Sequence, residues 1–548
     1  MLLANIFSWD NPNLYLVFIL SLINGVVLCL CSYKFLQIVQ LSGYKNKPYF
    51  SWIADTKSKN ISKLAMLSFL SLACLIITNV LFNAFQSDNI LGYIGLIFYF
   101  YFCGVYINNQ YKAKQKTPLR HTKRMIRLEI VLALVYAILT FCLTSLMIIA
   151  TNYLRLISFP LLVIAIPIVV PFVNIIMYPL EQMVNNHYIK KAKRVLNEND
   201  KLIKIGITGS YGKTTTKNFL SDILSTKYSV CKTPSSYNTP MGLTKVILKQ
   251  LSNENQIFIA EFGAKEVGDI AFLTKMIDPK FVAITSVGLQ HLDTFKSFDN
   301  IMNTKNEIIT HSSKDTICVF NTNCENTSKL FDLCDKEKYS SKIEDDESFV
   351  SAYNIKYGEN GTEFELRIGQ ERKVVSAKIL GKYNLDNLLT AIVIANKIGM
   401  SFDDIVESLK NIKPVAHRLE LKKLDSGMLV IDDSFNANIR GSRQALEVLS
   451  MFKDRRKIVT TPGLVELGEK ENEENYEFGK AIAQVADVCI IVNKNQAENI
   501  KKGLVDAGFN ENNIIEAENL FLAQDLFVKI LRSDDIMLIE NDLPDSYI

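Results

Sequence analysis

The sequence has little net charge and no paired cysteine motif, and each shortage excludes a class of protein. The 548 residues include 61 lysines and arginines against 57 aspartates and glutamates, which gives a formal net charge of +4. An excess this small does not indicate a nucleic-acid-binding protein. The ten cysteines form no CxxC pair and no Cys/His spacing typical of a metal site. We therefore expect all of them to be reduced, mostly buried side chains.

Long apolar runs are confined to the first third of the chain. A helix needs about 20 residues to cross a bilayer, and five runs are long enough. We therefore predict a transmembrane region of five helices over residues 1–185. The predicted spans are 14–30, 64–85, 90–107, 130–150 and 156–178.

Charge is scarce inside these spans and ahead of the first one. No basic residue precedes the first span, so a cleaved signal peptide is not expected. Only Glu129, at the edge of the fourth span, is ionisable. Because intramembrane charges mark transport pathways, their shortage argues against a transporter or a sensor. The spans are interpreted as an anchor in contact with membrane lipid.

Basic residues between the spans predict the orientation. They crowd the segments after the first, third and fifth spans and are nearly absent from the other two connections. Lysine and arginine accumulate on the cytoplasmic side of a membrane. The pattern predicts a multi-pass protein of the cell (inner, cytoplasmic) membrane, with its N-terminus outside and everything after residue 183 in the cytoplasm.

A phosphate-binding loop follows the membrane region. Residues 201–208 read as a buried strand, and 217–224 read as a helix. Glycines between them let backbone N–H groups close around phosphates at a helix N-terminus. The match is to the short form GxxGKTT, because Ile207 stands where the strict motif has glycine. It predicts that the chain uses ATP and Mg²⁺ as cofactors through Gly209, Ser210, Tyr211, Gly212, Lys213, Thr214 and Thr215.

The remaining chain alternates strand-like runs with helical segments, which predicts a mainly parallel α/β sheet and a second α/β unit after it. Ligands of such sheets lie at the carboxyl ends of strands. Glu261 and His291 follow two of these strands, and the acidic loop 432–438 follows a third. That loop could be a capped turn, or it could hold a ribose and a phosphate. A linker with Pro414 separates the two units.

The ordered motifs resemble the Mur ligase family, the ATP-dependent amino-acid-adding enzymes of peptidoglycan synthesis. The resemblance extends from residue 201 to the C-terminus and implies a P-loop ATP-binding domain 186–415 and a Rossmann-like C-terminal domain 416–548, after the transmembrane region 1–185 predicted from the apolar runs. It is carried by Thr208 to Thr216, Tyr237-Asn238-Thr239-Pro240, Glu261-Phe262-Gly263, His291-Leu292, Lys305, Asn384 with Asn387, His417-Arg418-Leu419, and the loop from Asp432 to Asn438.

The resemblance also implies roles for individual residues. The implied catalytic residues are Lys213, Glu261, His291 and Lys305. The implied Mg²⁺ ligands are Thr214, Glu261, His291 and, if it is carbamylated, Lys305; an unmodified helical lysine is the alternative. Further implied nucleotide contacts are Asn384, Asn387 (adenine), Arg418, Asp433 (ribose) and Asn436. The implied substrate contacts are Asn238 and Thr239.

The acidic loop resembles the member of the family that adds D-alanyl-D-alanine. The implied reaction joins D-Ala-D-Ala, or a similar amine, to a muramoyl-peptide acceptor through an acyl phosphate, releasing ADP and phosphate. The chain departs from that member because membrane spans replace its UDP-sugar-binding domain. Asn475 stands where a histidine is expected, and Glu540-Asn541-Asp542 replaces a Lys-Gly-Ser-type run. The acceptor, UDP-linked or lipid-linked, therefore stays open, as does a ligase for another envelope glycan or a polymer.

Overall fold

The structure is a computed structural model of the whole chain, and it divides after Asn185 into two compact units that are described separately. It describes residues 12–55, 59–85, 90–113, 117–150, 156–234, 237–289, 292–358, 361–434, 439–465, 467–492, 496–517, 527 and 530–541.

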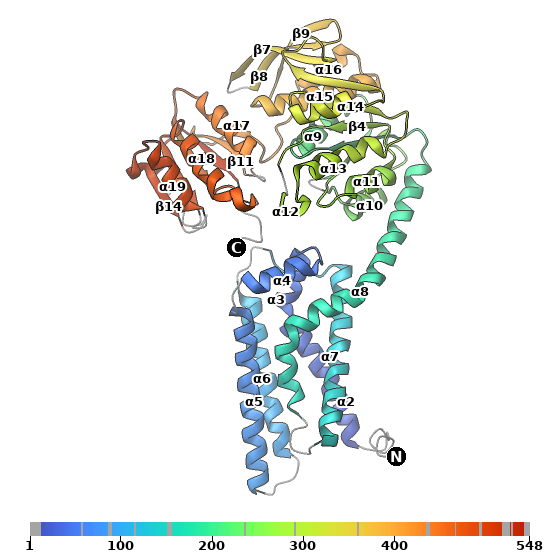
Figure 1. Ribbon diagram of the computed structural model, residues 1–548, viewed down its shortest axis with the longest axis vertical. Helices are drawn as coiled ribbons and strands as arrows, with labels where there is room; N and C mark the ends of the chain where they lie inside the picture. Colours follow the sequence, from blue (N-terminus) through green and yellow to red (C-terminus); the bar gives the residue numbers. More distant parts are fainter. Residues whose placement is uncertain are drawn as a thin grey trace. The chain divides into compact units, whose positions relative to one another are not determined.

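The first unit is helical, as Figure 1 shows. Its helices are α2 (Pro12–Cys31), α3 (Tyr33–Leu41), α4 (Asn46–Asp55), α5 (Lys59–Phe85), α6 (Ile90–Lys112), α7 (Lys123–Ala150) and the start of α8 (Ser158–Asn197). Helix α2 packs along α7, and α5 packs along α6. At Gly25 an added Cβ would lie 2.3 Å from the carbonyl oxygen of Ala133, so the first pair depends on a small residue for its close approach.

Three of these helices are long and apolar enough to cross a membrane, over Asn60–Thr78, Lys123–Leu146 and Ser158–Asn197. A fourth candidate is the pair α2 and α3, which is bent by 52°. The predicted apolar helical region is thus confirmed, with three to four candidate spans among the described residues. The predicted third span forms helix α6, but α6 is not among these candidates.

The second unit contains a nine-stranded sheet in the order β2-β3-β1-β4-β5-β6-β7-β8-β9. Its strands are β1 (Ile203–Thr208), β2 (Val230–Lys232), β3 (Ile257–Glu261), β4 (Phe281–Ile284), β5 (Ile317–Asn321), β6 (Lys338–Ile343), β7 (Val350–Gly358), β8 (Gly361–Ile368) and β9 (Glu371–Ala377). The pairing is parallel from β2 to β7 and antiparallel from β7 to β9. The prediction of a mainly parallel sheet is confirmed, and the antiparallel extension is an addition to it.

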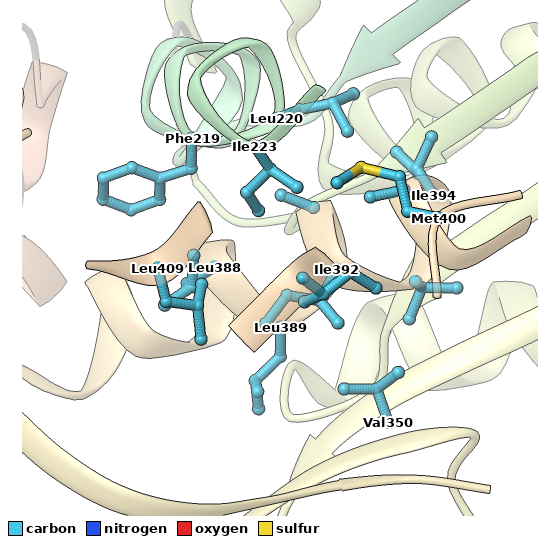
Figure 2. Close-up of a cluster of buried hydrophobic side chains, with 14 of the residues drawn as sticks. Phe219, Leu220, Ile223, Val350, Leu388, Leu389, Ile392, Ile394, Met400 and Leu409 are labelled. Atoms are coloured by element: carbon cyan, nitrogen blue, oxygen red, sulfur yellow. The ribbon is translucent and has the colours of Figure 1, made fainter. Parts of the chain in front are cut away.

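The helices between these strands are α9 (Lys213–Leu224), α10 (Pro240–Lys249), α11 (Asp269–Ile277), α12 (Leu292–Phe295), α13 (Phe298–Thr310) and α14 (Glu325–Leu333). Two more, α15 (Lys382–Ile398) and α16 (Phe402–Leu409), follow β9. Helix α15 packs on α9, and the apolar side chains between them are buried, including Phe219, Ile223, Leu388 and Ile392 (Figure 2). This packing fixes the helix that begins at the phosphate-binding loop.

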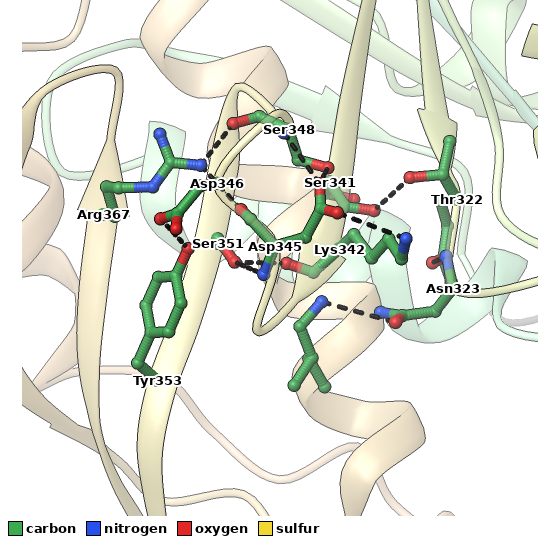
Figure 3. Close-up of polar contacts among 12 residues, drawn as sticks. Thr322, Asn323, Ser341, Lys342, Asp345, Asp346, Ser348, Ser351, Tyr353 and Arg367 are labelled. Atoms are coloured by element: carbon green, nitrogen blue, oxygen red, sulfur yellow. Dashed lines mark hydrogen bonds and ion pairs between the residues drawn. The ribbon is translucent and has the colours of Figure 1, made fainter.

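A polar network closes the turn between β6 and β7 (Figure 3). The guanidinium of Arg367, on β8, donates to the carbonyl oxygens of Asp345, Ser348 and Gly369 at 2.6 to 2.8 Å. Ser348 in turn donates through its hydroxyl to Asp345. Arg367 is buried, and these bonds pair its two terminal nitrogens and tie the antiparallel extension to the parallel sheet.

A six-stranded sheet follows in the order β10-β11-β15-β12-β13-β14. Its strands are β10 (Glu420–Lys423), β11 (Leu429–Asp433), β12 (Arg456–Thr461), β13 (Val488–Val492), β14 (Ile514–Ala517) and β15 (Asp535–Glu540), with helices α17 (Ile439–Ser450), α18 (Glu471–Ala483) and α19 (Ala497–Asp506). All neighbours are parallel except β10 and β11. The predicted second α/β unit is therefore present.

Candidate active site

The phosphate-binding loop joins β1 to α9 and needs glycine at two positions. Gly209 has φ +153°, and a Cβ there would lie 2.2 Å from Oγ1 of Thr285. Gly212 has φ +82°, and its Cβ would lie 2.2 Å from Oδ1 of Asn387. Only glycine tolerates both the backbone conformation and the space. The loop is thus packed between the segment after β4 and the start of α15.

The segment after β4 holds this loop in place by hydrogen bonds. The backbone N–H of Ser210 donates to the carbonyl oxygen of Ser286 at 2.7 Å, and that of Tyr211 donates to Oγ of Ser286 at 3.0 Å. Thr285 donates through its hydroxyl to the carbonyl oxygen of Tyr211. The sequence interpretation did not include Thr285 and Ser286 among the site residues. Their place directly after a parallel strand next to β1 is the signal that points to them.

Lys213 begins α9, and its ammonium group lies over the loop. Nζ donates to the carbonyl oxygens of Gly209 at 2.6 Å and Ser210 at 3.1 Å. Burial lowers the pKa of Lys213 to about 8; the charge of Glu261 opposes this shift, and that of Arg418 adds to it. Burial and the charge of Arg418 thus disfavour the positive charge of Lys213. An anion that binds beside Lys213 would offset this cost.

Glu261 lies at the end of β3 and receives hydrogen bonds on both carboxylate oxygens. Oε2 accepts from Oγ1 of Thr214 and from Nζ of Lys217, each at 2.9 Å, and Oε1 accepts from Nδ2 of Asn238 at 3.1 Å. Burial raises the pKa of Glu261, but Lys217 and Lys213 outweigh it, so the pKa is lowered overall. The carboxylate is therefore ionised and fixed in orientation.

The sequence interpretation missed Lys217. Its side chain is 1 % exposed and that of Glu261 is 2 % exposed, so their ion pair is fully buried. Lys217 follows Lys213 by four residues, which is one helical turn. That spacing is the signal that could have placed both ammonium groups on the same face of α9.

Lys305 lies on α13 and is 4 % exposed. Burial lowers its pKa to about 7; the charge of Lys213 also lowers it, while Asp269 and Glu307 raise it. Because the charge of Lys213 acts on Lys305, the fold brings these two lysines into the same site. At neutral pH a large share of Lys305 is the uncharged amine.

Helix α15 carries the two asparagines that are predicted to contact the nucleotide. Oδ1 of Asn387 accepts from the hydroxyl of Thr216 at 3.2 Å, and Asn387 also borders Gly212. Nδ2 of Asn384 donates to the carbonyl oxygen of Leu380 at 2.9 Å. Both asparagines are buried, and Asn387 lies beside the phosphate-binding loop.

The other predicted residues divide into placed and undescribed ones. Thr215 is buried on α9, and Thr239 caps α10 by accepting from the backbone N–H of Gly242 at 3.3 Å. His291 and Asn436 lie outside the described residues.

Arg418 and Asp433 form the part of the site contributed by the six-stranded sheet. Oδ1 of Asp433 accepts from the backbone N–H of Leu419 at 3.1 Å. Burial lowers the pKa of Arg418, and the charges of Asp433 and Glu261 oppose this shift. His417 and Leu419, on either side of Arg418, have φ +61° and +50°. Left-handed backbone at non-glycine residues is strained, and the nucleotide contact of Arg418 stays a prediction.

Asp432, next to Asp433, belongs to a separate polar cluster. Its Oδ2 accepts from Nδ1 of His417 at 2.8 Å and from Nζ of Lys422 at 2.6 Å, and Nζ also lies 3.0 Å from Oε2 of Glu420. His417, Glu420 and Asp432 are close enough together to bind a cation. The ammonium of Lys422 contacts both carboxylates, so this arrangement reads as an ion-pair network.

A cavity of about 390 Å³ lies beside these groups. Its lining includes Thr214, Asn218, Lys232, His417 and Arg418. This volume is in the range of small-molecule sites, roughly 300–1,000 Å³. The cavity is therefore large enough for part of a nucleotide next to the phosphate-binding loop.

Two family models match this part of the chain. The Mur ligase middle domain matches residues 207–395, and the Mur ligase glutamate ligase domain matches residues 417–540. The chain belongs to the Mur ligase family. In this Mur ligase the ordered motifs predicted from the sequence thus coincide with the family's two domains.

Individual relatives agree with this assignment. The UDP-N-acetylmuramoyl-tripeptide–D-alanyl-D-alanine ligase of Bacillus subtilis is 29 % identical over 280 residues, which are 51 % of this chain and 60 % of the relative. The ligase of the same name from Escherichia coli is 26 % identical over 332 residues, which are 60 % of this chain and 73 % of the relative. The chain thus spans less than two thirds of the length of the Bacillus relative.

Solved structures show the same fold. The MurF ligase from Thermotoga maritima in complex with ADP is 26 % identical, with a TM-score of 0.58 over 65 % of this chain and 80 % of that one. MurF from Acinetobacter baumannii is 23 % identical, with a TM-score of 0.59 over 66 % and 78 %. The apolar helices before residue 207 lie outside the matched family domains.

Proposed function

We propose that this Mur ligase is an ATP-dependent amide ligase of peptidoglycan precursor synthesis, which joins D-alanyl-D-alanine to a muramoyl-tripeptide. The observation that carries the proposal is the buried carboxylate of Glu261, which Thr214 and Lys217 hold beside the phosphate-binding loop. The names of the Bacillus and Escherichia relatives support the choice of substrates.

The first step makes an acyl phosphate. An oxygen of the acceptor carboxylate attacks the γ-phosphorus of ATP, the bond from that phosphorus to the β,γ-bridging oxygen breaks, and ADP leaves. Lys213 and the backbone N–H groups of the loop stabilise the negative charge of the transferring group. Burial lowers the pKa of Lys213, so a negatively charged phosphate that binds beside it would favour its charged form.

The residues fit a Mg²⁺ ion. Oγ1 of Thr214 and Oε2 of Glu261 are oxygen ligands of the type that Mg²⁺ prefers, and they lie 2.9 Å apart. When bound, Mg²⁺ neutralises charge on the phosphates. Lys217 keeps Glu261 ionised and oriented for this role. His291 is proposed as a further ligand on the family resemblance alone.

The second step forms the amide bond. The amine nitrogen of D-alanyl-D-alanine attacks the acyl carbon, the bond from carbon to the phosphate oxygen breaks, and the nitrogen releases a proton. Asn238, which is fixed by Glu261, and Thr239 are proposed to contact the substrate. Arg418, Asp433, Asn384 and Asn387 are proposed to hold the nucleotide.

Lys305 is proposed to be carbamylated. Only the neutral amine reacts with CO₂, and burial gives Lys305 a pKa of about 7. Nitrogen bonds to the carbon of CO₂ and loses a proton, which makes a carboxylate suited to a metal. With ¹³C-bicarbonate, we expect a protein carbamate resonance in the full chain that is absent from Lys305→Arg. Equal spectra would leave Lys305 an unmodified lysine.

The purified full chain in detergent tests the main proposal. With ATP, Mg²⁺, D-alanyl-D-alanine and UDP-muramoyl-tripeptide or its lipid-linked form, mass spectrometry should detect the acyl-dipeptide product with ADP and phosphate. Release of ADP should require both the acceptor and the dipeptide. Equal ADP release without either would refute the proposal.

The apolar helices favour a membrane location, with the ligase unit proposed to lie on the cytoplasmic side of the cell membrane. They also favour a lipid-linked acceptor. The full chain should then use a lipid-linked muramoyl-tripeptide with a higher kcat/KM than the UDP-linked one. The reverse ratio would assign the soluble acceptor.

A second candidate is a ligase that forms a different amide bond, for another envelope glycan or a polymer. It is favoured by the family match, which begins at residue 207 and is preceded by apolar helices. A mass-spectrometric screen of acceptors and amines separates the candidates, because only the second predicts turnover without any muramoyl peptide.

A further inference from the structure

The helical unit contains a cavity of about 460 Å³ between α3, α5 and α6. One end of the cavity is basic and rich in amides, with Lys34 from α3, Asn60 and Lys63 from α5, and Asn109 and Gln110 from α6. Among the described residues that line it there is no aspartate or glutamate. Two cations that share a cavity without an acid favour an anionic ligand.

The first of these lysines is held in position. Nζ of Lys34 donates to Oε1 of Gln37 at 2.9 Å. Gln37 is 3 % exposed and donates through Nε2 to the carbonyl oxygen of Thr117 at 2.5 Å. Among the residues that the structure describes, neither Lys34 nor Lys63 forms an ion pair with a carboxylate. Their positive charge is therefore available to a ligand.

The other wall of the cavity is apolar and faces outward. Met66 and Leu70 of α5 and Val105 of α6 line it, and they are 65 %, 38 % and 42 % exposed. Met66 and Leu70 lie within the candidate span Asn60–Thr78, and Lys63 lies near its start. The cavity thus changes from basic to apolar along the axis of a candidate span. An amphiphile with an anionic head has the same order of polarity.

Tyr106 lies between these two halves. Its side chain is 9 % exposed and lines the cavity, and Gln110 from the polar end of the cavity lies beside its hydroxyl. A phosphate oxygen at the basic end could accept its hydrogen.

We propose that this cavity binds an anionic membrane lipid, with its phosphate at Lys34, Lys63 and Tyr106 and the start of one chain along Met66, Leu70 and Val105. The volume suits a headgroup and a short length of chain. A free phosphate would leave the apolar wall without a ligand, and a zwitterionic choline headgroup would bring a cation towards two lysines. The proposal is independent of the ligase chemistry, because all the residues involved belong to the helical unit.

Native mass spectrometry of the purified full chain tests the site. The protein is released from detergent micelles that contain equal amounts of phosphatidylglycerol and phosphatidylcholine with identical acyl chains. We expect one retained phosphatidylglycerol in preference to phosphatidylcholine. Each of Lys34→Gln and Lys63→Gln should lower that retention about fivefold, since one basic residue near an anionic lipid contributes roughly that factor.

The matched control is Lys47→Gln, because Lys47 is an exposed lysine of α4 outside the cavity. It should retain phosphatidylglycerol like the parent, and Tyr106→Phe should lose part of the retention while keeping the parent's thermal stability. Millimolar inorganic phosphate should not displace the lipid. Equal retention of both lipids, an equal loss in Lys47→Gln, or displacement by phosphate would overturn the proposal.

Discussion

The carboxyl edges of the two sheets differ in their ionisable groups, which are mainly basic at one edge and acidic at the other. At the edge of the nine-stranded sheet, Lys213 and Lys217 act on the buried carboxylate of Glu261, and Lys305 lies where the charge of Lys213 reaches it. At the edge of the six-stranded sheet, Asp433 and Glu540 are partners in neighbouring parallel strands, and Glu540 is fully buried while Asp433 is partly buried.

The pKa values follow this contrast. Burial lowers the pKa of Lys213 and Lys305 at the first edge. At the second edge, burial raises the pKa of Asp433 and Glu540, and the charge of Asp433 raises that of Glu540 further. Groups of the same charge whose pKa values are shifted by burial are typical of ligand sites. The first edge suits phosphate, whereas the second suits a hydroxyl donor or a cation such as Arg418.

The largest expected effect is on catalysis at the cationic edge. Lys213→Ala removes the ammonium that stabilises the transferring phosphoryl group, so we expect kcat to fall by roughly 10²–10³-fold. ADP release at saturating substrates measures it. The control Lys249→Ala, at an exposed lysine of α10, should be unchanged. Near-normal turnover in Lys213→Ala with an unchanged melting temperature would refute the proposed site.

The second effect is on stability at the same edge. Lys217→Met leaves the Glu261 carboxylate without its buried partner, which should cost about 3–5 kcal/mol. Glu261→Gln should also destabilise the protein, and the double variant should be more stable than Lys217→Met alone. Thermal unfolding of the full chain compares them. Additive losses would show that the two charges are not coupled and that the cationic edge lacks its central ion pair.

The contrast between the edges was only partly predictable from the sequence. The phosphate-binding loop and the strands that end at Glu261 and Asp433 have local signals, because glycine spacing and apolar runs act within a few residues. The pairing of Lys217 with Glu261 depends on β3 lying beside β1, which a single sequence does not specify. The antiparallel strands β7 to β9 were not predicted, although β7 and β8 alternate in burial, which is the signal of a half-buried strand.

The third prediction concerns the pH dependence of stability. Lys305 has a folded-state pKa of about 7, below its ordinary value of 10.5, because burial disfavours its charge. Between these two values the unfolded chain binds more protons, so stability rises with pH, and it is lowest below pH 7. In bicarbonate-free buffer, Lys305→Met should raise the melting temperature most at pH 7 and progressively less towards pH 10. Parallel curves for the two proteins would contradict the assigned cause.

The smallest expected effect is at the acidic edge, where removing the ionisable group of Glu540 should stabilise the protein. Glu540 is 0 % exposed, and burial, with the charge of Asp433 added, holds its pKa well above 4.5. Above pH 4.5 the unfolded chain releases this proton more readily than the folded protein does, so the parent loses stability as pH rises.

Glu540→Gln keeps the shape and removes the ionisation, so it should stabilise the protein at pH 7 by about 1–3 kcal/mol. The gain should shrink as pH falls towards 4.5, and melting temperatures from pH 5 to pH 8 measure it. Glu516→Gln, at an exposed glutamate of β14 paired with Lys501, should change stability little at any pH. If Glu540→Gln is destabilising at pH 7, then Glu540 is ionised and compensated in the folded protein. The acidic edge would then resemble the basic edge in holding a buried charge that its neighbours compensate.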